Sequence, residues 1–225
     1  MTELSKRALG GAGQFVVALA LLLFLPAWSL RYWQAWVYWG VLSAAVLVIT
    51  LYFLKRAPDL IERRLAAGPA AERERSQKVI QGAATALFIA LLVVPGIEWR
   101  SRGTRFPLWV ILLGDALTAL AFATIFRVFQ ENRHASSVVE VSSGQRVITT
   151  GPYAVVRHPM YAGAMLLFFG TPLALGSVWA LAIAAALAAT IVVRLLYEER
   201  FLRANLPGYD EYRRKVRYRL VPYVW

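Results

Sequence analysis

Long uninterrupted runs of apolar residues are the feature that most limits how this chain can fold. Four of them cover residues 13–30, 33–54, 79–97 and 108–126, and Gln14 is the one strongly polar residue in the first. A helix of about 20 residues crosses a bilayer, because each residue advances about 1.5 Å through a hydrocarbon core roughly 30 Å thick. We therefore expect four membrane-spanning helices in residues 1–126.

The last apolar run, residues 160–196, is longer than one span requires. Gly170-Thr171-Pro172 and Gly176-Ser177 interrupt it, and such residues mark turns. We expect a helical hairpin with its turn near residues 171–177 and a short first arm. The predicted fold class is an all-α integral membrane protein with about five transmembrane spans plus this short arm.

Two polar segments divide the chain. Residues 55–78 carry seven basic and four acidic side chains and a Gly68-Pro69 break, which predicts a loop with short surface helices. An amphipathic helix there would dip into the membrane interface through Leu60, Ile61 and Leu65. Residues 127–159 predict an irregular, partly extended loop. We interpret residues 1–126 as a transmembrane scaffold and residues 127–225 as the catalytic region, made of a loop, a hairpin and a tail.

Composition agrees with a membrane protein and excludes several kinds of site. The chain is 59% hydrophobic with a mean hydropathy of +0.52, more apolar than an ordinary soluble domain. The net charge is +12, and the basic residues lie between the apolar runs without forming a recognised nucleic-acid-binding motif. This distribution favours anionic lipid over nucleic acid as the binding partner. With no Cys and only two His, a thiolate or His-based metal site is not expected.

The distribution of basic residues predicts the orientation in the membrane. If the N-terminus is cytoplasmic, 21 of the Lys and Arg residues fall on the cytoplasmic side and 4 on the other. The positive-inside rule then favours an N-in, C-in topology. Arg outnumbers Lys and Ala is abundant, which is typical of a GC-rich prokaryote, so we expect the prokaryotic cytoplasmic membrane.

Two groups of polar residues flank the last hairpin. Arg157, His158 and Tyr161 stand where it begins, and Arg194, Glu198 and Glu199 where it ends. The simpler interpretations are headgroup anchors for the first group and a helix-surface Arg194–Glu198 pair for the second. Polar groups at a membrane edge are nevertheless costly unless something satisfies them. We expect the hairpin to bring the two groups together into one site.

Two further features are less specific. In the basic tail, Tyr209 and Tyr212 lie at i and i+3 and present one aromatic face, which we assign to the substrate side of the site, although a basic helix on anionic lipid would also explain the tail. Asp115 lies alone within the fourth span, where helix-to-helix hydrogen bonding or protonation explains it better than catalysis.

The ordered motifs of the C-terminal part resemble a known superfamily. They are Gly151-Pro152-Tyr153, Arg157-His158-Pro159-x-Tyr161-x-Gly163, Glu198-Glu199-x-x-Leu202 and Gly208-Tyr209-x-x-Tyr212. Walker, dinucleotide-binding, G-x-S-x-G and H-E-x-x-H motifs are missing. Over residues 140–222 the chain resembles the isoprenylcysteine carboxyl methyltransferase and phospholipid methyltransferase superfamily.

The resemblance implies an integral-membrane methyltransferase that uses S-adenosylmethionine and methylates a lipidic acceptor, either a carboxylate or an amine. It also implies a cytosolic cofactor pocket. The catalytic candidates are Glu198, Glu199 and Arg194, and no metal is expected. The cofactor-binding positions that it implies are Tyr153, Arg157, His158, Pro159, Tyr161, Gly163, Glu198 and Glu199.

Two alternatives remain open at the level of sequence. One is an NADPH-dependent reductase of the sterol-reductase type, which carries a similar R-H-P-N-Y motif but has Asn where this chain has Met160. The other is a non-catalytic membrane scaffold of the same fold.

Overall fold

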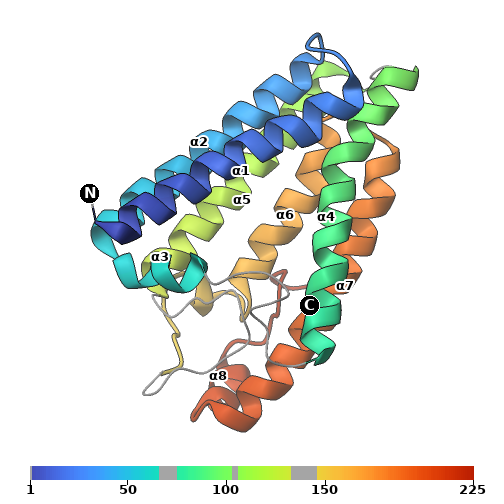
Figure 1. Ribbon diagram of the computed structural model, residues 1–225. Coiled ribbons are helices and arrows are strands. Elements are labelled where there is room, and N and C mark those ends of the chain that lie inside the picture. The colour runs from blue at the N-terminus through green and yellow to red at the C-terminus, as the bar shows by residue number, and fades with distance from the viewer. Residues whose placement is uncertain (1, 66–74, 103–105, 133–145) are drawn as a thin grey trace.

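A computed structural model describes residues 2–65, 75–102, 106–132 and 146–225 of the chain. Within those ranges every regular element is helical. The predicted break at Gly68-Pro69 lies outside the described residues. The elements shown in Figure 1 are α1 (Glu3–Ala27), α2 (Trp33–Arg56), α3 (Pro58–Leu65), α4 (Arg75–Arg102), α5 (Leu108–Glu131), the 3-10 helix η2 (Gly151–Ala154), α6 (Pro159–Ala174), α7 (Trp179–Asn205) and α8 (Tyr209–Lys215).

The lengths and composition of these helices confirm an all-α integral membrane fold. Among the described residues, α1, α2, α4, α5 and α7 are long and apolar enough to cross a bilayer. With 16 residues, α6 is the short arm of the predicted hairpin. The hairpin turn occupies residues 175–178, at the end of the range that the sequence predicted.

Three of the helix boundaries that differ from the predictions have a local explanation. The first helix begins at Glu3 rather than at residue 13, because Thr2 caps it and its Oγ1 accepts a hydrogen bond from the Ser5 N–H at 3.2 Å. The third span does not end near Pro95, and the last hairpin does not break at Pro172, since both prolines lie inside helices. Membrane helices tolerate proline because the surrounding bundle satisfies the freed backbone groups.

One end of the bundle gathers segments that are distant in sequence. A buried apolar cluster there joins the start of α1, the end of α2, α3 and the end of α5. Its members are Ala8, Phe53, Ala57, Leu60, Ile61, Val128 and Phe129. We call this the basic end, because it carries Lys6, Arg7 and the basic segments that follow α2 and α7. Leu60 and Ile61 therefore face the protein and do not form the interfacial surface that the sequence suggested.

The opposite end is held by polar contacts around the hairpin turn. Glu98 on α4 accepts hydrogen bonds from the Ser177 hydroxyl at 2.6 Å and from the Trp179 N–H at 3.2 Å. A carboxylate in this position satisfies free N–H groups at the start of α7 and complements the helix dipole. Tyr32 donates a hydrogen bond to the carbonyl of Leu175 in the same turn. The turn is thus fixed against α2 and α4.

The closest helix contact is between α5 and α6, and two glycines permit it. A Cβ atom added to Gly114 would lie 2.1 Å from the backbone nitrogen of Ala174, and one added to Gly170 would lie 3.0 Å from the carbonyl oxygen of Gly114. Small residues allow backbones to approach in this way inside membranes. This contact sets the position of α6 and therefore of the residues at its start.

We predict that Gly114→Ala destabilises the protein, because the new methyl group would force the α5 and α6 backbones apart at a cost of about 1–3 kcal/mol or more. Gly82→Ala on α4 is the matched control, since nothing lies within 4 Å of its added Cβ. Ala is the better helix former by up to about 1 kcal/mol, so Gly82→Ala should leave the melting temperature unchanged or raise it. Equal melting temperatures of the two variants in detergent would contradict the packing described here.

Candidate functional site

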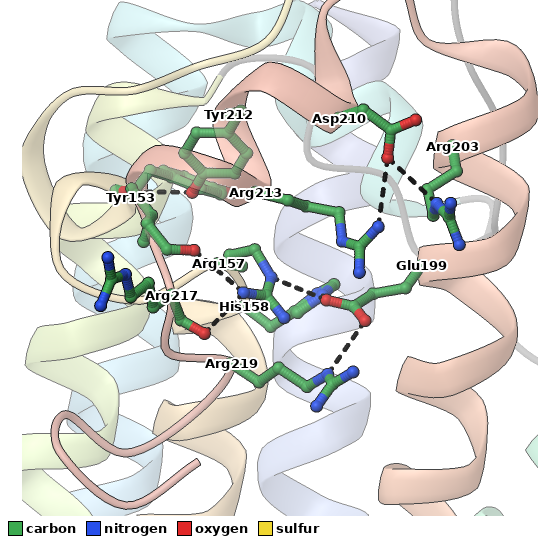
Figure 2. Close-up of polar contacts among 11 residues, drawn as sticks. Tyr153, Arg157, His158, Glu199, Arg203, Asp210, Tyr212, Arg213, Arg217 and Arg219 are labelled. Carbon is green, nitrogen blue, oxygen red and sulfur yellow. Dashed lines mark hydrogen bonds and ion pairs between the residues drawn. The ribbon is translucent and has the colours of Figure 1, made fainter.

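Glu199 is the centre of a buried charge cluster at the basic end of the bundle (Figure 2). Its carboxylate accepts hydrogen bonds from Nε of Arg157 at 2.7 Å and from Nε of Arg219 at 2.9 Å. Nε2 of His158 lies 3.4 Å from the same carboxylate, longer than a typical hydrogen bond. A buried carboxylate is stable only when opposite charges and donors surround it. These contacts therefore join α7, the start of α6 and the C-terminal tail.

The tail is also attached through its backbone. Four consecutive carbonyl groups, those of residues 216–219, accept hydrogen bonds from Arg157 and His158. Nη1 of Arg157 donates to the first two at 2.9 and 2.7 Å. The N–H groups of Arg157 and His158 donate to the third and fourth at 2.9 and 3.0 Å. Arg157 thus orders the tail as well as neutralising Glu199.

A second polar network lies beside the first and contains Glu198. The Tyr161 hydroxyl donates to the Glu198 carboxylate and accepts from Nε of Arg194 at 3.3 Å. Nη1 of Arg194 in turn donates to Oε1 of Gln77 on α4, also at 3.3 Å. Arg194 and Glu198, which the sequence allowed to be a simple helix-surface pair, meet here at the Tyr161 hydroxyl. Glu198 is half-buried, whereas Glu199 is 5% exposed.

The aromatic residues of the site are held at its sides. The rings of His158 and Tyr161 stack with their centroids 5.8 Å apart. The Tyr212 hydroxyl donates to the carbonyl of Tyr153 at 2.7 Å, and the amide of Asn132 donates to the Tyr153 hydroxyl at 2.9 Å. The predicted tyrosines of η2 and α8 therefore contact one another and join the same region as Arg157.

Burial extends the pH range over which the phenols of the site stay protonated. It is the main cause that raises the pKa of Tyr153 to about 12. Burial also raises the pKa of Tyr209 and of Tyr212 above the ordinary value for a phenol. All three side chains are consequently neutral hydroxyl groups in the site.

Two residues predicted to bind the cofactor have structural contacts in this fold. Pro159 is buried and occupies the first turn of α6, where its missing N–H costs no hydrogen bond. A Cβ atom on Gly163 would lie 3.3 Å from the carbonyl oxygen of Ala121 on α5. The sequence left open whether Gly163 approaches a helix or a ligand, and the structure shows the approach of a helix.

Some buried polar atoms of the site have no hydrogen-bond partner among the described residues. They include Nε2 of His158 and the hydroxyl oxygen of Tyr209, and both residues are at most 5% exposed. Buried polar atoms without a partner are costly and often mark a position that a ligand or water satisfies. Asp115 is also buried without a partner, but it follows Gly114 on α5, at the far end of α6 from His158.

Sequence reasoning missed Gln77 and Arg219 as members of the site. Gln77 is 5% exposed on α4 and precedes the apolar run, where a polar residue gives no signal by itself. Arg219 belongs to the basic tail and was indistinguishable from its neighbours, which the sequence assigned to lipid contacts. In the structure Arg219 contacts Glu199, whereas Arg217 has an exposed side chain.

Comparison with known proteins covers the part of the chain that contains most of this site. Residues 109–207 match the model of the phospholipid methyltransferase family. That range contains α5, α6 and α7, with Arg157, His158, Tyr161 and both glutamates, but neither Gln77 nor Arg219.

A curated relative supports the same relationship. Protein-S-isoprenylcysteine O-methyltransferase B of Arabidopsis thaliana is 28% identical over 134 residues, which covers 57% of this chain and 65% of the relative. The chain therefore spans just under two thirds of that relative's length. The family match, the relative and the clustered motif residues agree, and together they support the resemblance to the superfamily of the isoprenylcysteine carboxyl methyltransferases and phospholipid methyltransferases.

Proposed function

We propose that this protein transfers a methyl group from S-adenosylmethionine to a lipidic or membrane-embedded acceptor at the cytoplasmic membrane interface. The observation that carries the proposal is the meeting of Arg157 and His158 with Glu199, from motifs some forty residues apart, in one buried cluster. The family relationship supports methyl transfer over the reductase alternative, since both matches are to methyltransferases.

The charges of the site fit the cofactor. S-adenosylmethionine carries an amino-acid carboxylate, an ammonium group and a sulfonium. Glu198 is half-buried and, with the Tyr161 hydroxyl as its donor, retains acceptor capacity for an ammonium. The stacked rings of His158 and Tyr161 offer an aromatic face, which attracts a cation. Nε2 of His158 and the Tyr209 hydroxyl, which lack a hydrogen-bond partner among the described residues, would supply further polar contacts.

The two adjacent glutamates therefore receive different roles in this proposal. Glu199 is bonded to two guanidinium groups, which stabilise its ionised form and keep it from taking up a proton. Glu198 is the cofactor-facing carboxylate and, for an amine acceptor, the candidate base. A carboxylate acceptor is already ionised and needs no base, so the protein would contribute mainly positioning and exclusion of water.

The proposed orientation places the basic end in the cytoplasm. Arg157, Glu199 and the tail all lie at that end, and the sequence assigns it 21 of the basic residues. The positive-inside rule then gives N-in and C-in, with the cofactor reached from the cytosol and the acceptor from the bilayer. For the prokaryotic chain expected from the sequence, this membrane is the inner membrane.

Binding of the purified protein to S-adenosylhomocysteine and to NADPH tests the reaction class. We expect calorimetric binding of S-adenosylhomocysteine and none of NADPH, because the site offers the charges described above. A protein that binds NADPH but not S-adenosylhomocysteine would be a reductase, and one that binds neither would be a scaffold.

Separate substitutions of the two glutamates test their roles. Glu198→Gln should weaken S-adenosylhomocysteine binding by about tenfold or more, through loss of a charge-assisted hydrogen bond, while the melting temperature changes little. Glu199→Gln should lower the melting temperature, because removing one partner of a buried ion pair costs about 3–5 kcal/mol. Asp115→Asn is the control and should leave the dissociation constant within about twofold. Equal effects of the two Gln variants on both measurements would contradict this division.

Labelled methyl groups identify the acceptor chemistry. Membranes that contain the protein are supplied with methyl-labelled S-adenosylmethionine and either S-farnesylated N-acetylcysteine, a carboxylate, or phosphatidylethanolamine, an amine. A methyl ester releases volatile methanol in base, whereas an N-methyl group does not. Transfer to either probe supports the proposal and names the acceptor class, and transfer to neither lipid probe nor to any extracted membrane lipid would contradict it.

A further inference from the structure

The C-terminal tail covers the charge cluster instead of extending away from it. Residues 216–219 run beside Arg157 and His158, and all four of their carbonyl groups accept hydrogen bonds from these two residues. We call residues 216–219 the strap. Every strap carbonyl therefore accepts a hydrogen bond from the motif at the start of α6. Figure 2 shows Arg217 and Arg219 of the strap beside Arg157 and His158.

One side chain of the strap makes an ion pair with the site. Nε of Arg219 lies 2.9 Å from Oε2 of Glu199. The Arg219 side chain is 27% exposed, whereas that of Glu199 is 6% exposed, so this ion pair lies at the boundary with solvent. The guanidinium carbon also lies 4.9 Å from the ring centroid of Trp225, close enough for a cation–π contact. A contact in this position can exchange with water when the strap moves.

Beneath the strap the site is closed to a ligand. Arg157, His158, Glu199 and Tyr209 are all at most 7% exposed. Nε2 of His158 and the hydroxyl of Tyr209, which have no hydrogen-bond partner among the described residues, lie among these covered side chains. A molecule as large as S-adenosylmethionine reaches such atoms only if a covering segment moves. The strap contacts Arg157, His158 and Glu199, and its own side-chain contact, Arg219 to Glu199, lies at the boundary with solvent.

We propose that Arg219 is a further residue of this site and that its ion pair with Glu199 closes the strap, which opens to admit the cofactor. This inference rests on the proposed function. Arg219 acts as a positioning residue: it holds Glu199, and through Glu199 the Arg157 guanidinium, without itself being required to touch the cofactor. The rate of cofactor binding is then set partly by how often the Arg219–Glu199 contact breaks.

The neighbouring basic residues do not share this role. Arg217 has an exposed side chain and meets Arg157 only through its carbonyl oxygen. Arg213 and Arg203 pair with the exposed carboxylate of Asp210 at 3.1 and 3.0 Å. A tail that only bound anionic lipid would use Arg217 and Arg219 alike. The structure distinguishes them, which provides a matched control.

The test compares Arg219→Gln with Arg217→Gln in the purified whole chain. Surface plasmon resonance gives the association and dissociation rate constants of S-adenosylhomocysteine for each variant. Arg219→Gln should raise both rate constants, each by about tenfold, because loss of a charge-assisted hydrogen bond increases the open population. Arg217→Gln should leave both within about twofold, and Arg219→Lys, which keeps the charge, should restore part of the wild-type behaviour.

A residue that only contacted the ligand would change the dissociation rate and leave association unaltered, and that result for Arg219→Gln would overturn the proposal. Equal rates in Arg219→Gln and Arg217→Gln would overturn it as well.

Hydrogen exchange of the same variants gives a readout that needs no ligand. The amides of Arg157 and His158 are protected by the strap carbonyls, so the peptide that contains them should exchange faster in Arg219→Gln and not in Arg217→Gln. An unchanged exchange rate in Arg219→Gln would overturn the proposal that the Arg219–Glu199 ion pair holds the strap closed. Failure of the wild-type chain to bind S-adenosylhomocysteine would instead overturn the proposed function, and faster exchange in Arg219→Gln would then show a strap over a different ligand site.

Discussion

The carboxylate of Glu199 is buried near the C-terminal end of α7, and it needs positive charge close to it. Arg157 and Arg219 supply that charge from two different segments. An isolated buried charge is far more costly than a paired one. The folded state is therefore stable only when the start of α6 and the tail pack against α7 and pair with Glu199. The other polar contacts at the basic end, including the bonds from Arg157 to the strap, follow from this arrangement.

Packing at the opposite end of the bundle makes the pairing possible. The close contact of Gly114 and Gly170 fixes α6 against α5, and Glu98 caps α7 beside the hairpin turn. The two arms of the hairpin are therefore fixed at the turn, and their other ends meet at Glu199. This explains why residues as far from the cluster as Gly114 contribute to its geometry, although they carry no polar group of their own.

The N-terminal half of the chain also contributes to the site. Gln77 on α4 accepts from Arg194, and Leu60 and Ile61 of α3 belong to the buried apolar cluster against which Met160 at the start of α6 packs. Gln77 and α3 lie outside residues 109–207, the range that matches the family model. In the proposed reaction the matched region would supply the groups that meet the cofactor, and the preceding helices would position Arg194 and enclose the site.

The sequence by itself determined the class of fold and the composition of most of the site. Apolar length predicts spans because the bilayer has a fixed thickness, and the ordered motifs identify Arg157, His158, Tyr161, Glu198 and Glu199 as one group. It did not predict that Pro95 and Pro172 lie within helices, because neighbouring helices decide whether a lost hydrogen bond is tolerated.

Only the tertiary structure decided how the two glutamates differ. Adjacent residues on a helix point about 100° apart, so one faces Arg157 and Arg219 and the other faces Tyr161, a distinction that spacing along the chain does not contain. For the same reason, spacing along the chain does not predict that Arg219 rather than Arg217 contacts Glu199, or that Gln77 contacts Arg194. A side chain's role in this site depends on which distant segment lies opposite it, and that is fixed by packing of the whole bundle.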